Sequence, residues 1–297
     1  MKKLNLALVF LIILILFPTG TITASPEEIT RTIYIEDTSD LIQLSKDCSF
    51  DGFSQGLEVI LTSDIDLNDK DFTPIPIFLG TFDGKGHTIK GLSITVEGSN
   101  QGFFRYLQEG GVIKNLNIEG ILTPLGEKST VGGIVGYNRG TIEDCSFSGY
   151  INGKDIIGGL AGWNGDTGMI IDSSSKGIIY GKRKVGGITG FNSGTILRSI
   201  NKISVNTTIE EEDFDYGDLD LSLDNIDITQ ISRLAPDITD IGGIAGVNTG
   251  IIKNSKNEGV IGYPQVGYNV GGIAGRQTGF ISDCSNYGSV QGRKEVS

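Results

Sequence analysis

The stretch that decides the fold is V-G-G-I-V-G-Y-N-R-G-T-I, residues 131–142. Nearly the same phrase begins again at Ile157, Val185, Ile241 and Val270, at successive steps of 26, 28, 56 and 29 residues. A fixed period of roughly 20 to 50 residues is typical of stacked repeats, in which each unit buries its apolar surface against the next. The sequence therefore predicts a repeat architecture and not a single globular core.

Aligning the copies places equivalent residues in columns. One column contains isoleucine in every copy: Ile113, Ile142, Ile170, Ile196, Ile252 and Ile281. Such columns arise when parallel strands of successive coils lie directly above one another. Helical repeats are disfavoured, because the chain holds 44 glycines and each glycine inside a helix costs about 1 kcal/mol relative to alanine. The columns predict an all-β parallel solenoid of eight to ten coils.

Asparagine forms a further column, made of Asn138, Asn164, Asn192 and Asn248. Asparagine tolerates the left-handed backbone conformation better than most residues, and its amides can stack from coil to coil. We expect these four residues to lie at corners, in the left-handed conformation, with stacked amides. A structural role is favoured over ligand binding.

The phrase V-G-G-I-x-G-x-N-x-G-x-I, at Val131, Val185 and (with Ile first) Ile241, is similar to the GLUG motif of bacterial surface proteins. These include adhesin-like proteins and the β-helical parts of IgA-protease-type enzymes. The resemblance covers roughly residues 32–297 and implies a right-handed parallel β-helix. It brings no catalytic residues, because the metalloprotease members carry H-E-x-x-H in a separate domain and this chain has one histidine.

The remaining sequence predicts three regions. Residues 1–24 resemble a secretory signal, with Lys2 and Lys3 before a short apolar run, so we expect a secreted or cell-surface protein that meets the membrane only through this segment. Residues 25–56 predict an N-terminal cap, with a short strand and a helix N-capped by Ser39. Residues 57–297 predict the β-helix itself, including one strand from Leu57 to Leu67.

The C-terminal end of the sequence suggests a missing continuation. Val296 stands where another copy of the repeated phrase would start. An uncovered last coil would present unpaired strand edges. We therefore hypothesise that the chain is a truncated part of a longer protein.

An acidic excursion at residues 206–240 interrupts the repeats. It carries eleven Asp and Glu residues and one basic residue, Arg233, so its net charge is 1 − 11 = −10. The formal net charge of the whole chain is −12. We expect a solvated loop, in which the candidate ligands for a hard cation are Asp213, Asp215, Asp218 and Asp220. Asp64, Asp66 and Asp69 do not follow the EF-hand pattern of ligands and glycine, so we predict no metal site elsewhere and no cofactor.

Of the three cysteines, Cys145 and Cys284 are predicted to be unpaired, buried side chains, whereas Cys48 lies outside the repeats and could be buried or free. Cys145 and Cys284 occupy one column at least four coils apart, which at about 4.8 Å per coil exceeds the span of a disulfide.

Catalytic residues are not evident in the sequence. His87 is the only histidine and lies in a glycine-rich turn, so neither a catalytic triad nor a zinc site can be assembled from histidines. The alternative is a polysaccharide lyase or hydrolase built on the Asp144, Asp172 and Asp283 column. The acidic charge disfavours nucleic acid as a partner.

Aromatic residues supply the one candidate contact surface. Tyr137, Trp163 and Phe191 share one column, and three further aromatics, Tyr106, Tyr263 and Tyr268, lie in or near the repeats. Stacking between coils explains the column, and an outward orientation would make it a contact strip. The sequence thus predicts an exported, non-enzymatic β-solenoid that serves as a surface, adhesion-like or spacer module, with a host or matrix protein or a glycan as its candidate partner.

Overall fold

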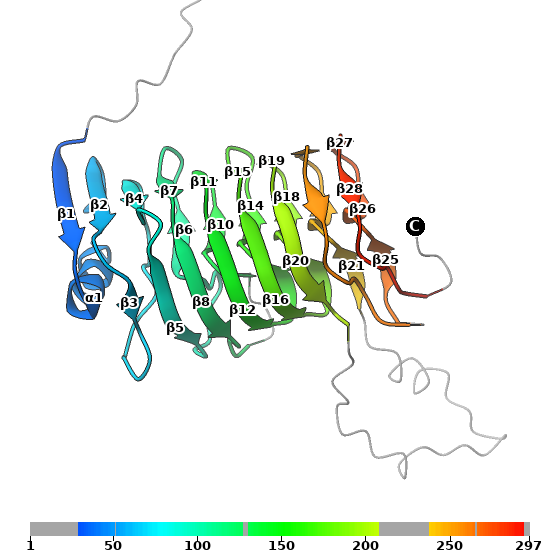
Figure 1. The fold of residues 1–297 in the computed structure, drawn as a ribbon, viewed down its shortest axis with the longest axis horizontal. Helices are drawn as coiled ribbons and strands as arrows, with labels where there is room; N and C mark the ends of the chain where they lie inside the picture. Colours follow the sequence, from blue (N-terminus) through cyan, green and yellow to red (C-terminus); the bar gives the residue numbers. More distant parts are fainter. Residues whose placement is uncertain (1–28, 51, 127–129, 208–237, 265, 294–297) are drawn as a thin grey trace, which may run out of the picture.

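The computed structural model describes residues 29–50, 52–126, 130–207, 238–264 and 266–293. Its strands stack side by side along the long axis of the molecule, in sequence order from the N-terminal to the C-terminal end (Figure 1). All named strand pairs are parallel, and they form four sheets. The predicted parallel β-helix is therefore confirmed.

The four sheets, here sheets A to D, run along the solenoid. Sheets A and B begin in the N-terminal coils, whereas sheet C begins at Phe104 and sheet D at Val131. Sheet A holds β1 (Arg31–Ile35), β2 (Leu57–Leu61), β4 (Thr81–Asp83), β7 (Val112–Lys114), β11 (Thr141–Glu143), β15 (Met169–Ile171), β19 (Thr195–Leu197), β23 (Ile251–Lys253) and β27 (Phe280–Ser282). Sheet B holds β3 (Ile65–Asp66), β5 (Thr88–Ile94), β8 (Asn117–Leu122), β12 (Ser146–Asn152), β16 (Ser174–Tyr180), β20 (Ile200–Val205), β24 (Lys256–Asn257) and β28 (Ser285–Asn286).

The repeated phrase forms the other two sheets. Sheet D holds β9 (Val131–Gly132), β13 (Asp155–Gly158), β17 (Arg183–Gly186), β21 (Thr239–Gly242) and β25 (Tyr268–Gly271). Sheet C holds β6 (Phe104–Leu107), β10 (Val135–Asn138), β14 (Ala161–Asn164), β18 (Thr189–Asn192), β22 (Ala245–Asn248) and β26 (Ala274–Gln277). Gly133 makes the corner between them, where a Cβ atom would lie 2.3 Å from the ring of Phe147. The glycine of the phrase is thus required by close packing.

The isoleucine column is the apolar spine of the interior. Its members pair in register from β7 through β27. The first five are fully buried, and Ile281 in the last coil is partly buried. Like side chains therefore stack along the axis as the sequence predicted.

The asparagine column lies inside the solenoid and not at left-handed corners. Asn138, Asn164, Asn192 and Asn248 end strands of sheet C, are fully buried, and are not among the residues with positive φ. Their amides do stack, with Asn138 Nδ2 donating to Asn164 Oδ1 at 2.7 Å. The predicted stacking is confirmed, and the predicted conformation is wrong, because strand geometry directs the amides inward.

A second ladder of asparagine amides, buried except at Asn286 in the last coil, was not expected from the sequence. Asn201 Nδ2 donates to Asn257 Oδ1 at 2.7 Å, and Asn257 Nδ2 donates to Asn286 Oδ1 at 2.6 Å. These residues replace Phe147 and Ser175 of the earlier coils at the same register positions. Each buried amide is therefore satisfied by its equivalents in neighbouring coils.

The N-terminal end carries the expected strand and helix, with two differences. Helix α1 (Thr38–Asp47) is N-capped by Asp37, whose side chain accepts hydrogen bonds from the backbone of Ser39 and Asp40, so the predicted cap at Ser39 is two residues late. The helix buries Leu41 and Leu44 in the core. The expected single strand from Leu57 to Leu67 is divided into β2 and β3.

Residues at both ends of the predicted acidic excursion, residues 206–240, belong to the solenoid. Asn206 is buried and bonds the backbone of Gly181 through both side-chain polar atoms, at 2.8 and 2.9 Å. Asp240 lies within β21 and pairs with Arg276 at 3.4 Å. Residues 208–237, like the predicted signal segment 1–24, lie outside the described residues.

Candidate functional site

Four aromatic side chains form one continuous row on sheet C, here called the aromatic strip: Tyr106, Tyr137, Trp163 and Phe191. They come from β6, β10, β14 and β18 and pair in register, each one strand from the next. Each of the four residues is partly exposed, while its neighbours on either side along the strand are buried, with the exception of Arg105 beside Tyr106, which is partly exposed. The predicted column of Tyr137, Trp163 and Phe191 therefore faces outward.

The rings of the aromatic strip contact one another along the axis. Successive ring centroids are 4.8, 5.1 and 5.2 Å apart, and the ring planes meet at 67°, 69° and 59°. Tilted and edge-to-face contacts of this kind are the arrangement that aromatic quadrupoles favour. Burial between its neighbours raises the pKa of Tyr137, so its hydroxyl stays a neutral donor and acceptor.

A row of mostly polar side chains, here called the polar column, borders the aromatic strip. Its members are Gln108, Arg139, Ser193 and Thr249, each directly after a strand of sheet C, and Gly165 interrupts the row after β14. Each donates its backbone N–H to a carbonyl of the preceding coil, at 2.8 to 2.9 Å, so they occupy one register position. Trp163 Nε1 donates to Ser193 Oγ at 3.2 Å, which links the two rows.

A shallow pocket of about 450 Å³ lies where the aromatic strip begins. Its lining combines Tyr106 with apolar and polar side chains: Ile77, Leu79, Gln108, Glu109 and Arg139. Arg139 Nη2 pairs with Glu109 Oε2 at 2.9 Å, so the two charges compensate one another. The pocket thus joins an apolar wall to a neutral set of hydrogen-bonding groups.

The ends of the aromatic strip are defined by the next residues in register. Val247 follows Phe191 on β22 and is 2% exposed, and Arg276 follows on β26.

The other candidate aromatic residues lie outside the strip. Tyr268 lies on β25 of sheet D, and Tyr263 lies in the connection before it. Sequence alignment did not place Tyr106 in the column, because the segment F-R-Y-L of its coil lacks the repeated phrase.

The Asp144, Asp172 and Asp283 column is a row of backbone corners. The three residues have φ of 49°, 48° and 54°, the left-handed conformation that was predicted for the asparagine column. Arg198, at the same position in its own coil, holds both carboxylate oxygens of Asp172 at 2.7 and 2.6 Å. This hydrogen bonding lowers the pKa of Asp172, so its carboxylate is held ionised in the ion pair. A general acid needs a proton to donate, so the lowered pKa does not fit that role.

His87 is paired with a carboxylate, which the sequence did not indicate. Its Nδ1 lies 3.1 Å from Asp64 Oδ1, and the Thr88 N–H donates to the same oxygen at 2.9 Å. Asp66 pairs with Lys90 at 3.3 Å. Within the residues that the structure describes, no group of three or more His, Cys, Asp or Glu side chains is placed to hold a metal ion.

The four candidate cation ligands of the excursion, Asp213, Asp215, Asp218 and Asp220, lie outside the described residues. All three cysteines are free, as predicted for Cys145 and Cys284, and Cys284 is only partly buried where a buried side chain was expected. Burial raises the pKa of Cys48 and of Cys145 to about 12, so both thiols stay protonated.

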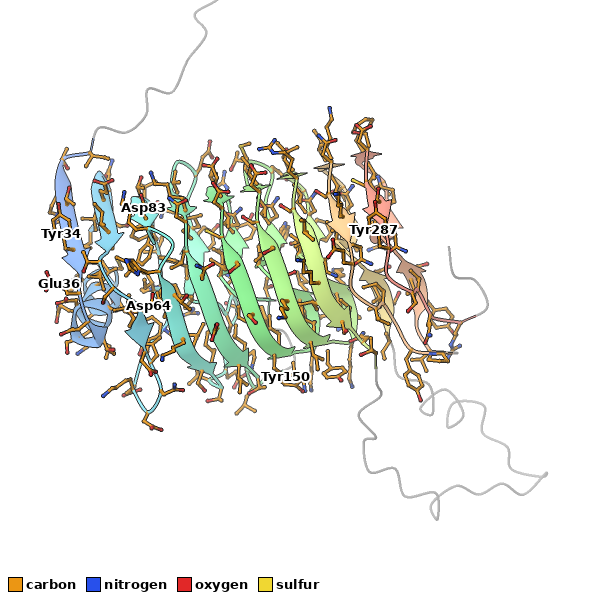
Figure 2. The ribbon with its side chains drawn as sticks, in the orientation of Figure 1. Tyr34, Glu36, Asp64, Asp83, Tyr150 and Tyr287 are labelled. Atoms are coloured by element: carbon orange, nitrogen blue, oxygen red, sulfur yellow. The ribbon has the colours of Figure 1, made fainter. Side chains whose placement is uncertain are left out.

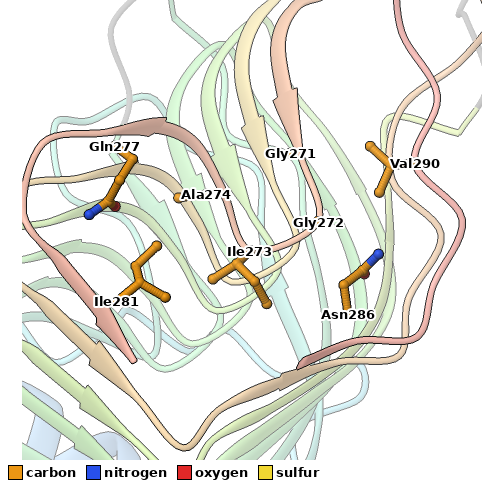
Figure 3. Close-up of a pocket in the computed structure, with 8 residues that line it drawn as sticks. All are labelled: Gly271, Gly272, Ile273, Ala274, Gln277, Ile281, Asn286 and Val290. Carbon is orange, nitrogen blue, oxygen red and sulfur yellow. The ribbon is translucent and has the colours of Figure 1, made fainter. Parts of the chain in front are cut away.

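The last coil leaves part of the apolar interior open at the C-terminal end (Figure 3). A hollow of about 430 Å³ lies there, lined by backbone of the repeated phrase and by side chains of the core and the two ladders: Ile273, Ala274, Gln277, Ile281, Asn286 and Val290. It has no charged lining residue, and its side chains continue the interior columns of the preceding coils.

Comparisons with known proteins agree with the architecture. Residues 129–152 match the family model described as the GLUG motif. Over 86 residues, or 29% of this chain, the sequence is 41% identical to Halomucin of Haloquadratum walsbyi, and the match spans 1% of that protein. The chain thus corresponds to a small fraction of this relative.

A solved structure shows the same fold over most of the chain. It is the crystal structure of a candidate immunoglobulin A1 protease from Bacteroides ovatus, with a TM-score of 0.62 over 85% of this chain and 74% of that chain. At 19% sequence identity the likeness concerns the fold alone. Among the described residues, no helix is long and apolar enough to cross a membrane.

Proposed function

We propose that this parallel β-helix, which contains a GLUG segment, is an exported, non-enzymatic module that makes surface or adhesion-like contacts through the aromatic strip. The observation that carries the proposal is the continuity of the strip over four adjacent strands. Aromatic side chains offer large, rigid contact area with little loss of conformational entropy on binding. The solenoid supplies the rigid support that holds them in line.

Export is supported by the sequence and by the names of the similar proteins. Residues 1–24 have the charged start and short apolar run of a secretory signal. Halomucin and the candidate immunoglobulin A1 protease both bear names of proteins that work outside the cell. The test is to express the full chain with its own N-terminus in a bacterial host and to sequence the N-terminus of the exported product. Retention in the cytoplasm with Met1 intact would contradict export.

The contact role is tested by binding of the purified chain to a panel of matrix proteins, mucins and cell surfaces. We expect Tyr137→Ala and Trp163→Ala to weaken binding, because they remove rings from the middle of the aromatic strip. Tyr287→Ala is the matched control, since Tyr287 is 70% exposed and lies in the last coil (Figure 2), directly after β28 of sheet B and not on sheet C. Binding that all three variants retain would reject the strip as the contact surface.

The polysaccharide-enzyme alternative is tested in the same preparations. A lyase or hydrolase releases new chain ends from a polysaccharide panel. We expect no turnover, because Arg198 engages both oxygens of Asp172 in the carboxylate column on which that alternative depends. Turnover that is lost in Asp144→Asn or Asp172→Asn would replace the non-enzymatic proposal. An empty binding screen without turnover would favour a purely structural stalk.

A further inference from the structure

The ligand chemistry of the aromatic strip can be inferred from the two rows of side chains together. The strip offers ring faces and edges, and the polar column beside it offers a side-chain amide, a guanidinium and two hydroxyls. A ligand that contacts both rows needs apolar surface along one side and hydrogen-bonding groups along the other. Both rows run from coil to coil along sheet C, so a ligand that contacts several of their members is extended along the solenoid axis.

Resting on the proposed contact role of the strip, we propose that the ligand is a neutral, soluble oligosaccharide lying along the axis. A pyranose ring presents C–H groups on its faces and hydroxyls at its edge, which matches an aromatic row beside a polar row. The pocket at Tyr106 would receive one sugar unit, with Gln108, Glu109 and Arg139 as hydrogen-bond partners for its hydroxyls. Further units would lie along Tyr137, Trp163 and Phe191.

The charges that border the strip favour a neutral ligand over an anionic one. Recognition of carboxylate, sulfate or phosphate groups relies on cationic side chains that are not already paired. Arg139 is paired with Glu109 at 2.9 Å, and Arg105 Nε donates to the carbonyl of Asn100 at 3.2 Å. Lys184 Nζ lies 5.8 Å from the centre of the Phe191 ring, so one cation borders the far end of the strip. These groups do not form a continuous cationic row.

The hydrogen bonding of sheet C disfavours an extended peptide. A peptide that binds by strand addition needs a free sheet edge for its backbone groups. Strands β10, β14 and β18 each have a hydrogen-bonded strand on both sides, and β6 pairs with β10 on one side and bridges to Ile75 and Phe78 on the other. The strip lies on the face of the sheet, where an extended peptide backbone would find few partners.

The tilt of the rings favours a soluble oligosaccharide chain over a crystalline polysaccharide surface as the ligand. Planes that meet at 59° to 69° cannot form one flat platform. A chain whose successive sugar rings turn relative to one another can follow this alternation. A crystalline polysaccharide surface cannot.

The experiment uses the only tryptophan of the chain as its probe. Trp163 lies in the middle of the strip, so a ligand bound there changes its fluorescence. The full mature chain is titrated with cellohexaose, maltohexaose and chitohexaose as neutral probes, with hexagalacturonate as the anionic probe and with extended peptides. Calorimetry on the same samples gives the dissociation constants.

We expect saturable binding of at least one neutral hexasaccharide, weaker binding of its disaccharide, and no response to hexagalacturonate or peptides. Tyr137→Ala and Tyr106→Ala should raise the dissociation constant about tenfold, as losses of central contact rings commonly do. Gln108→Ala keeps every ring and should also weaken binding, whereas Tyr287→Ala should not. Circular dichroism and thermal unfolding of each variant separate lost contacts from lost folding.

Two results would overturn the inference. One is the absence of binding by every neutral hexasaccharide, and the other is neutral binding that the strip substitutions leave unchanged. If the oligosaccharides fail while Tyr137→Ala still abolishes attachment to the matrix or cell panel, the ligand class is wrong and the contact role stands. If the strip variants also bind that panel normally, both proposals fail.

Discussion

Asn164 Nδ2 donates a hydrogen bond to Asn192 Oδ1 across 2.8 Å, and both side chains are fully buried. Asn192 in turn donates to Asn248 at 2.7 Å, and Asn248 donates to Gln277 Oε1 at 2.8 Å. Asn164, Asn192 and Asn248 each accept from the coil before and donate to the coil after. The ladder is therefore a chain of buried amide hydrogen bonds that all run in one direction along the axis.

Replacing one member of this ladder should destabilise the whole solenoid. Asn192→Leu removes the acceptor of Asn164 Nδ2 and the donor to Asn248 Oδ1, and a buried polar atom without a partner costs about 1–3 kcal/mol. We expect a loss of that size in the free energy of unfolding, measured by urea denaturation. Thr167→Ala on an exposed turn is the control. A change in Asn192→Leu no larger than in the control would contradict a stabilising ladder.

Ile156 is a strained residue whose replacement should stabilise the protein. It has φ of 53°, and Lys184, Asp240 and Asn269 adopt the same conformation in later coils, at 53°, 60° and 52°. A β-branched side chain is disfavoured there by about 1–2 kcal/mol relative to glycine. We expect Ile156→Asn to raise the midpoint of thermal unfolding.

The matched control for Ile156 is Ile178→Asn. Ile178 is also partly exposed, at 42%, but it lies within β16 and is not among the residues with positive φ. The same substitution there should be neutral or destabilising, because isoleucine favours strands. Equal effects at the two sites would show that backbone strain is not the cause.

Asp83 should make stability depend on pH in the acidic range. Its side chain is 3% exposed and lies beside Lys85 and Lys114, 3.0 and 3.5 Å away. Burial alone would raise its pKa, but hydrogen bonds from Asn115 and Lys85 lower the pKa of Asp83 to about 2. Its stabilisation is therefore fully present above pH 3.8, the unfolded value, and is lost as the pH falls toward 2.

The measurement is the free energy of unfolding of the wild type and Asp83→Asn at several pH values. The pKa difference corresponds to about 2 kcal/mol at neutral pH. We expect the variant to be less stable at pH 7 and the two proteins to converge near pH 2. A difference that stays constant across this range would assign the effect to packing and not to charge.

The three thiols should differ in reactivity. Cys48 and Cys145 are buried with a pKa of about 12, whereas Cys284 in the last coil is partly exposed. Because the thiolate is the reactive species and must be reached by the reagent, we expect a thiol reagent to label Cys284 first in the native protein. All three should react in urea. Fast native labelling of Cys145, identified by peptide mass, would contradict the buried position.

The strand stacking was predictable from sequence because each coil must bury an apolar side chain at the same position. Ile142, Ile170 and Ile196 sit at equal positions of successive copies, and parallel stacking is the arrangement that buries all of them at once. The cysteine separation followed from the same count of coils. The N-cap was missed because Asp37 and Ser39 are both good capping residues, and the choice depends on where the preceding strand β1 ends.

The candidate site was predictable only in part. Tyr137, Trp163 and Phe191 were aligned by the repeated phrase, but Tyr106 joined them through strand register in a coil that lacks the phrase. The pocket beside it requires Ile77 and Leu79, which are distant from Arg139 in sequence. Such neighbours are set by the stacking of coils, so a local pattern does not reveal them.

The sequence by itself determined the period, the apolar spine and the parallel stacking, because these depend on spacing and on hydrophobic burial. The tertiary structure alone decided which way the residues around the asparagine column face. In β10, β14 and β18 of sheet C the aromatic residue and the asparagine after it are adjacent, so one points out and the other in. Strand alternation requires only that the two side chains point to opposite faces of the sheet. The packed interior, which provides hydrogen-bond partners for every amide, decides that the asparagines are inside and the rings outside.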